Sequence, residues 1–329
     1  MRLSEFPISS LTGVRVVQEI AAGEFSRLPL LPDLFTGIEI EGEGVSVSRS
    51  AETRMRSLGW ALHHDDSLRR DGMEFVLDQP LNGEKLGAAI TGLFDIYREG
   101  DVYWEPSPRA GTHIHLNASH KTVGFVQAFT ALVYCVDELI FNFADEDRRW
   151  CSYCNSLNTL APSTLQSLLV NRQYEEYEGW RGVWPISDRD RYYGCNITSI
   201  AKYGTVELRY FPTPTSEEQL WLWLDLCHAL YQVAEAYEGE DNPAGAVIDK
   251  AKHDTAGLLA EIKFLAQDDE AIRSVQEAAQ ELQSILEVVP DTLRANEPVG
   301  NLNALWERAM RQAEELGYPV SYFDDNEES

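Results

Sequence analysis

Apolar and polar residues alternate in several short segments between residues 35 and 210, and this alternation is typical of β-strands. The turn residues Asp65-Asp66-Ser67 separate two of the segments. Residues 1–34, which precede the first segment, are expected to be an irregular or partly helical lead-in. The segments predicted to be strands are 35–47, 59–64, 73–77, 112–116, 193–199 and 205–210.

Other segments repeat their apolar residues at the three- and four-residue spacing of a helix. Residues 84–98 place Leu86, Ile90 and Leu93 on one face, and 121–144 is an apolar stretch without proline that predicts a buried helix. Between these regions, 172–192 is rich in aromatic residues and is expected to be a long loop. Further helices are predicted at 163–170, 216–237, 244–266, 269–287 and 301–316. Strands followed by a run of helices indicate an α+β fold.

Acidic and histidine side chains gather on one face of four predicted strands, because residues two apart on a strand share a face. The side chains on these polar faces are Glu39, Glu41, Glu74, His113, His115, Glu207 and Arg209. Taken strand by strand, the pattern is compatible with the solvated side of an antiparallel sheet. Lysine, however, is absent from all four faces, and four carboxylates on one sheet would repel one another unless cations neutralise them.

These residue types suit a site for a metal-bound nucleotide. Carboxylate oxygens are the ligands that Mg²⁺ prefers, together with water and substrate phosphates. Arg209, beside Glu207, supplies a guanidinium of the geometry that phosphate oxygens accept. Neither a Walker-type loop nor a G-x-G-x-x-G loop is present to hold the nucleotide elsewhere. The pattern therefore predicts metal–ATP on the polar face of the sheet.

Charge narrows the expected partners. The 329 residues contain 27 Lys and Arg against 54 Asp and Glu, a formal net charge of −27. Such a negative field repels nucleic acid and anionic membrane surfaces, so neither is expected as a partner. The hydrophobic content of 44% is sufficient for a core and excludes a wholly disordered chain. No run of about 18 apolar residues is present, so no membrane span is expected.

The five cysteines are an odd number and too few for a disulfide scaffold, which favours free thiols in the cytoplasm. The first residues, MRLSEFPISSLTG, lack the apolar core of a signal peptide. Cys151 and Cys154 have the spacing of a zinc or redox pair. No second pair and no neighbouring histidine completes four ligands, so this interpretation is not favoured.

Six motifs, in this order, make the sequence resemble the amidoligase family, which belongs to the carboxylate–amine ligase superfamily with glutamine synthetase and glutamate–cysteine ligase. The resemblance extends over about residues 35–230. Three positions depart from the family pattern: Asp66 replaces Gly, Asp78 replaces Ser and Cys195 replaces Leu. The motifs are Gly37-Ile38-Glu39-Ile40-Glu41, Asp65-Asp66-Ser67-Leu68, the segment 72–81, the segment 109–116, the segment 191–197 and the segment 204–211.

The resemblance implies a curved, mainly antiparallel sheet with helices packed on one face, a glutamine synthetase-like catalytic fold. It also implies that ATP phosphorylates a substrate carboxylate and that an amine then attacks the acyl phosphate to form an amide. In this interpretation Mg²⁺, or alternatively Mn²⁺, is held by Glu39, Glu41, Glu74 and Glu207. The nucleotide and its phosphates would contact His113, His115, Arg209 and Asn196. The catalytic residues would be Arg209, Glu207 and Arg109, of which Arg109 would hold an anionic group of the substrate.

The resemblance and the patterns together predict four parts. These are a lead-in (1–34), an amidoligase-like catalytic domain (35–240), a helical C-terminal region packed on it (241–322) and an acidic tail (323–329). The expected partners are a small-molecule or peptide carboxylate and an amine, and an oligomeric assembly is compatible with the sequence.

Two other functions remain open at this point. One is a metal-dependent hydrolase that uses the His113-x-His115 pair and the glutamates around Zn²⁺ or Mn²⁺. The other is a non-catalytic binding or scaffold protein descended from such an enzyme. Binding of Mg²⁺–ATP with release of ADP would distinguish a ligase from both alternatives.

Overall fold

The structure, a computed structural model, describes residues 2–12, 33–70, 72–173 and 188–287. Every described residue belongs to one compact unit, Met1–Glu287. The helix expected at 301–316 and most of the aromatic loop, 174–187, lie outside the described residues.

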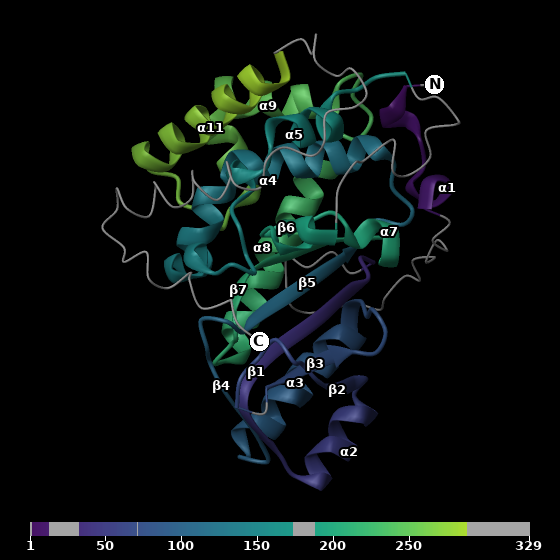
Figure 1. Cartoon of the computed structure of the whole chain (residues 1–329), viewed down its shortest axis with the longest axis vertical. Coiled ribbons are helices and arrows are strands. Elements are labelled where there is room, and N and C mark those ends of the chain that lie inside the picture. The colour runs from purple at the N-terminus through teal and green to yellow at the C-terminus, as the bar shows by residue number, and fades with distance from the viewer. Residues whose placement is uncertain (1, 13–32, 71, 174–187, 288–329) are drawn as a thin grey trace, which may run out of the picture. The chain divides into compact units, whose positions relative to one another are not determined.

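A seven-stranded antiparallel sheet forms the centre of this unit (Figure 1). Its order is β2-β3-β1-β5-β7-β6, and β4 pairs with the far end of β1. The strands are β1 (Thr36–Val47), β2 (Trp60–His64), β3 (Met73–Leu77), β4 (Val102–Glu105), β5 (Gly111–Asn117), β6 (Cys195–Asn196) and β7 (Thr205–Pro212). The α+β class and the antiparallel sheet are confirmed.

Helices connect the strands and continue after the sheet (Figure 1). The α-helices are α1 (Ile8–Thr12), α2 (Arg49–Ser57), α3 (Gly83–Arg98), α4 (Val123–Ala144), α5 (Pro162–Leu169), α7 (Ser199–Tyr203), α8 (Glu217–Glu235), α9 (Pro243–His253), α10 (Thr255–Ile262) and α11 (Asp269–Glu287). Short 3₁₀ turns are η1 (Leu3–Glu5), η2 (Glu146–Trp150), η3 (Leu157–Thr159) and η5 (Asp188–Tyr192).

Most of the predicted elements fall within a few residues of their expected bounds, but two do not. The strand expected over 193–199 is only Cys195–Asn196, because the Asn196 side chain accepts a hydrogen bond from the Thr198 backbone and turns the chain into α7. The helix expected over 244–266 is two helices. Asp254 ends the first and caps the second by accepting a hydrogen bond from the Gly257 backbone N–H.

The apolar face of the sheet packs against α3, α4 and α8. Trp60 of β2 donates its indole N–H to the carbonyl of Ala89 in α3 (2.9 Å). Thr36 of β1 is hydrogen-bonded to His228 of α8 (3.0 Å). Helices α9 and α11 pack in turn on α4, so α4 is surrounded by protein. By length and composition α4 could cross a membrane, but 94% of its most apolar window is buried in the protein, as befits a core helix.

Asp137 places a carboxyl group inside this core. The side chain is 1% exposed and accepts hydrogen bonds from Tyr210 Oη of β7 (2.5 Å) and Ser156 Oγ (2.6 Å). Burial raises the pKa of Asp137 from about 3.8 to about 6, although these hydrogen bonds oppose the rise. The native state therefore binds a proton more tightly than the unfolded state does.

The raised pKa of Asp137 predicts a specific pH dependence of stability. Its contribution is complete below pH 3.8 and is lost as pH rises through about 6. The loss amounts to about 3 kcal/mol at most, since one pKa unit corresponds to about 1.4 kcal/mol. Asp137→Asn keeps an acceptor for Tyr210 and cannot ionise. Urea unfolding between pH 4.5 and 7.5 should therefore lose less stability in the variant than in the wild type; parallel profiles would contradict this.

Candidate active site

The polar sides of β3, β1, β5 and β7 form one continuous surface. The antiparallel register places Glu41 opposite Glu74, Glu39 opposite His113, and His115 opposite Glu207. Residues directly opposite on antiparallel strands lie on the same face of the sheet. The strands lie side by side (Figure 1), so six side chains meet. This carboxylate–histidine cluster consists of Glu39, Glu41, Glu74, His113, His115 and Glu207.

The histidines of β5 lie between the glutamates of β1 and β7. His113 Nδ1 is 3.0 Å from Glu39 Oε2, and its Nε2 is 3.5 Å from Glu41 Oε1. His115 Nε2 is 3.4 Å from Glu39 Oε1 and 3.9 Å from Glu207 Oε2. Both imidazoles are buried, since β5 is buried along its whole length. The polar face is therefore not the solvated side of a sheet.

Glu207 is held by three neighbours. Arg209 Nη1 donates to Glu207 Oε1 (2.6 Å), whereas Asn196 Nδ2 and Ser199 Oγ both donate to Oε2 (2.6 Å each). The structure thus brings Arg209 and Asn196, two residues singled out in the sequence, to the edge of the cluster. Ser199, at the start of α7, was not expected there. The polar run N-I-T-S directly after a strand was the one available signal for it.

Glu41 is held by the backbone. The side-chain Oε2 of Glu41 accepts a hydrogen bond from the Gly111 backbone N–H at 2.7 Å. The backbone carbonyl oxygen of Glu41 accepts one from the Thr213 hydroxyl at 2.8 Å. Both partners belong to the chain around β5 and β7. The carboxylate is therefore fixed by rigid elements of the sheet, with its other oxygen directed toward His113.

The charges of the cluster influence one another strongly. Burial raises the pKa of Glu74 to about 8, and the nearby carboxylates of Glu39 and Glu41 add to the rise. Burial would raise the pKa of Glu39 as well. Hydrogen bonds from His113 and His115 outweigh this effect and hold the pKa of Glu39 well below its usual range. The carboxylates are thus too crowded for all of them to ionise without further positive charge.

Positive charge comes in part from the neighbours of Glu207. Burial would raise the pKa of Glu207, but the charges of His115 and Arg209 lower it below its ordinary value. Burial would likewise lower the pKa of His115, but the charges of Glu207 and Glu39 raise it. The ionised form of Glu207 is therefore favoured, and Arg209 balances only part of the negative charge in the cluster.

The donor set suits a divalent cation. Two groups offer ligand atoms within 4.8 Å of one another: Glu39, His115 and Glu207 in the first, and Glu39, Glu74 and His113 in the second. His115 Nε2 is buried and directed at the carboxylates of Glu39 (3.4 Å) and Glu207 (3.9 Å). Carboxylates alone favour Mg²⁺, whereas a mixed carboxylate–imidazole set is also suited to Mn²⁺. Glu41, through His113, adjoins the second group.

Arg109 lies outside the cluster. Its Nη2 donates to the Ser67 carbonyl (2.9 Å) and to Tyr153 Oη (3.2 Å). The rim of the cluster carries two residues that were not anticipated: the half-exposed ring of Tyr203 meets His115 edge-on at 5.8 Å, and the ammonium of Lys202 lies 4.5 Å from the tyrosine ring. They place an aromatic and a cationic group beside His115.

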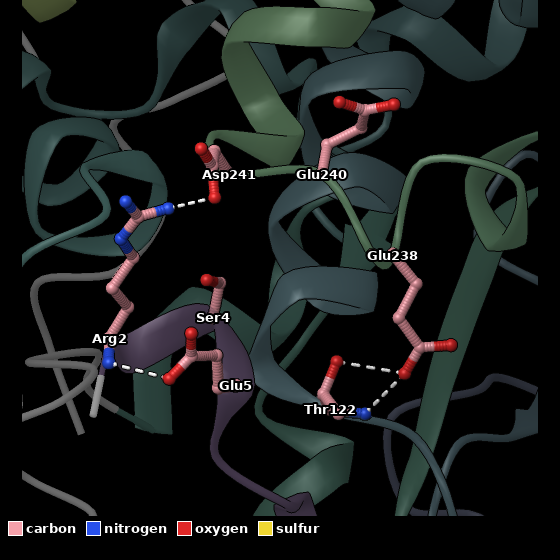
Figure 2. A pocket seen from close by; sticks show the side chains of 8 residues that line it. Arg2, Ser4, Glu5, Thr122, Glu238, Glu240 and Asp241 are labelled. Carbon is pink, nitrogen blue, oxygen red and sulfur yellow. Dashed lines mark hydrogen bonds and ion pairs between the residues drawn. The ribbon is translucent and has the colours of Figure 1, made fainter.

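A separate cavity of about 210 Å³ lies between the N-terminal segment and the chain that follows α8 (Figure 2). Glu238 accepts hydrogen bonds there from the backbone N–H and hydroxyl of Thr122, and Arg2 pairs with Asp241. None of the site residues singled out in the sequence lines it. The lining residues are Arg2, Ser4, Glu5, Thr122, Glu238, Gly239, Glu240 and Asp241.

Comparison with known families agrees with the sequence motifs. Residues 80–231 match the model of a family described as "putative amidoligase enzyme". The match confirms the resemblance to the amidoligase family over this part of the chain and supports a ligase-type enzyme. The match includes β5, β6 and β7 but begins after β3, so Glu39, Glu41 and Glu74 precede it. No curated protein matches the chain significantly.

Proposed function

We propose that the protein is an ATP-dependent carboxylate–amine ligase that forms an amide bond through an acyl phosphate. The observation that carries the proposal is the convergence of carboxylates, two histidines and Arg209 on one face of the sheet, within a family of amidoligases. Amide formation from a carboxylate needs activation, because oxide is a poor leaving group. Transfer of the γ-phosphoryl group of ATP to the carboxylate oxygen releases ADP and provides a better one.

The cluster would hold one or more Mg²⁺ or Mn²⁺ ions through its four carboxylates, those of Glu39, Glu41, Glu74 and Glu207, together with the two histidines. Such ions would neutralise the charge of the phosphate groups. The carboxylates of Glu41 and Glu207 are fixed by backbone and side-chain hydrogen bonds before any ligand arrives. Little reorganisation is then needed during the reaction.

Arg209 would stabilise the phosphoryl group in transfer. One nitrogen of its guanidinium binds Glu207, while the buried Nε has no hydrogen-bond partner among the described residues. The charge of Glu207 raises the pKa of Arg209 despite the opposing effect of burial, so the group stays cationic. Arg109, outside the cluster, would hold an anionic part of the acid substrate.

The amine would then attack the carbonyl carbon of the acyl phosphate. The new C–N bond forms as the C–O bond to phosphate breaks, phosphate leaves, and the amine loses a proton. His113, His115 and Glu207 are themselves buried, which would limit the access of water that competes with the amine.

The test is ADP release from Mg²⁺–ATP across a panel of carboxylic acids and amines, with products identified by mass. With an acid labelled by ¹⁸O in its carboxylate, one label should appear in the released phosphate, because an acyl phosphate transfers that oxygen. A metal-dependent hydrolase would cleave a substrate without ADP release. ADP release that needs no acid, or phosphate without label, would reject the ligase mechanism.

A further inference from the structure

Arg148 is a buried guanidinium behind the candidate site. It belongs to η2, directly after α4, and its side chain is 3% exposed. Among the side chains that the structure describes, no carboxylate lies within ion-pair distance of Arg148. Burying a charge without a counter-ion is unfavourable unless hydrogen bonds compensate. The groups that supply these hydrogen bonds are therefore informative.

Apart from a 3.9 Å contact of Nη1 with Cys151 Sγ, the Arg148 guanidinium donates to backbone carbonyls of two segments that flank the site. Nη1 donates to the Ala110 carbonyl at 2.9 Å and to the Pro108 carbonyl at 3.4 Å. Nη2 donates to the carbonyl of Arg209 at 3.2 Å. One side chain thus connects the loop before β5 to the strand that carries Arg209.

The contact with Ala110 leads directly to the cluster. The carbonyl of Ala110 and the N–H of Gly111 belong to the same peptide group, and this N–H donates to Glu41 Oε2 at 2.7 Å. The peptide thus accepts from a cation at one end and donates to an anion at the other. Hydrogen bonds in such a chain polarise and strengthen one another. Arg148 therefore acts on Glu41 through a single peptide.

Gly111 permits this arrangement. A Cβ atom at position 111 would lie 2.5 Å from Arg148 Nη2 and 3.2 Å from its Cζ. The first distance is shorter than Cβ atoms approach other atoms in folded proteins, and the second is tighter than most Cβ contacts. The guanidinium can reach the carbonyls on either side only because residue 111 has no side chain.

We propose that Arg148 is a positioning residue for the metal–phosphate centre: its guanidinium, through the 110–111 peptide and the Arg209 carbonyl, fixes Glu41 relative to Arg209. The proposal rests on the proposed function, because it assumes that the cluster binds a divalent cation. Partners outside the ligand set commonly change metal affinity by about 10- to 100-fold when removed. Arg148 is such a partner, because it contacts Glu41 only through the peptide group between residues 110 and 111.

The test uses Mn²⁺ affinity of the full chain, measured by electron paramagnetic resonance, which needs no turnover. Arg148→Met removes the donors and should weaken Mn²⁺ binding by about tenfold. Arg148→Lys keeps the charge but cannot donate to both carbonyls. Its Mn²⁺ affinity should lie between that of Arg148→Met and that of the wild type. Gly111→Ala should displace the guanidinium and weaken binding as well. Millimolar guanidinium chloride should restore affinity in Arg148→Ala, whereas sodium chloride at equal ionic strength should not.

The neighbouring Arg149 provides the matched control. It pairs with Glu138 (2.6 Å) and donates to Asn142 (3.1 Å), away from the site. Arg149→Lys should leave Mn²⁺ affinity unchanged. Rescue by guanidinium is measured within one folded variant, so a general loss of stability cannot imitate it. If Arg148→Ala does not fold, Arg148→Lys and Gly111→Ala decide the question.

Two results would overturn the proposal: Mn²⁺ affinity within about twofold of the wild type in the Arg148 and Gly111 variants, or losses equal to that of Arg149→Lys. The proposed ligase function is judged separately. A wild-type protein that binds Mn²⁺ but releases no ADP with any acid would reject the ligase and leave the role of Arg148 to be decided by the metal measurements. A wild-type protein that binds no Mn²⁺ would reject both.

Discussion

Replacing Glu39 by glutamine should abolish ATP turnover and weaken Mn²⁺ binding by about a hundredfold or more. Glu39 contributes to both groups of candidate metal ligands and accepts from His113 at 3.0 Å. The amide keeps the size of the side chain but removes its charge, and loss of a direct ligand should exceed the 10- to 100-fold effect of indirect partners. Turnover is measured by ADP release and affinity by electron paramagnetic resonance.

A buried glutamate on the opposite side of the sheet serves as the control for this substitution. Glu217 of α8 accepts from Thr91 Oγ1 (2.6 Å) and from Arg98 Nη1 (3.2 Å). Glu217→Gln should lower the melting temperature by weakening these contacts, yet leave Mn²⁺ affinity and turnover intact. Glu39→Gln should melt close to the wild type. Normal turnover in Glu39→Gln would exclude the cluster as the site of the chemistry.

Replacing Arg209 by lysine should separate metal binding from catalysis. A guanidinium that stabilises the transferring phosphoryl group contributes about 10³- to 10⁵-fold to kcat in other phosphoryl-transfer enzymes. Lysine keeps the charge but not the planar donor geometry, so kcat should fall by at least about 10²-fold. The ligands of the cluster remain in place, and Mn²⁺ affinity should change little.

The same variant also tests the geometry of Glu207. Arg209 Nη1 is 2.6 Å from Glu207 Oε1, but Asn196 and Ser199 hold the other oxygen. Glu207 should therefore remain in position without the guanidinium. A loss of Mn²⁺ affinity as large as the loss of kcat would instead mean that Arg209 mainly organises the metal ligands.

The alternation of side chains was sufficient to predict the polar faces. Glu39 and Glu41 lie on one face of β1, and the buried Ile38 and Ile40 lie on the other, as expected. Successive side chains of a strand point to alternate faces. The roles of these residues as metal ligands remain predictions. The order of the strands within the sheet could not be derived from periodicity, because it depends on which strands pair in the folded chain.

Residues that act through the backbone could not be found in this way. Arg148 lies in a short polar segment after α4, where arginine is ordinarily solvated, and only the folded chain brings it to Ala110. Lys202 and Tyr203 likewise reach the rim because α7 interrupts a predicted strand. Helix α2 was missed because its polar sequence buries only Ala51 and Met55.

The central position of β5 restricts how the chain can change in length. Both faces of this strand are buried, with Ile114 in the apolar core and the two histidines among the glutamates. Inserting or deleting one residue within it would exchange the two sides, placing imidazoles in the core and isoleucine among the acids. Natural variants should consequently gain or lose residues in the turns between strands, where a change in length does not move side chains to the other face of the sheet.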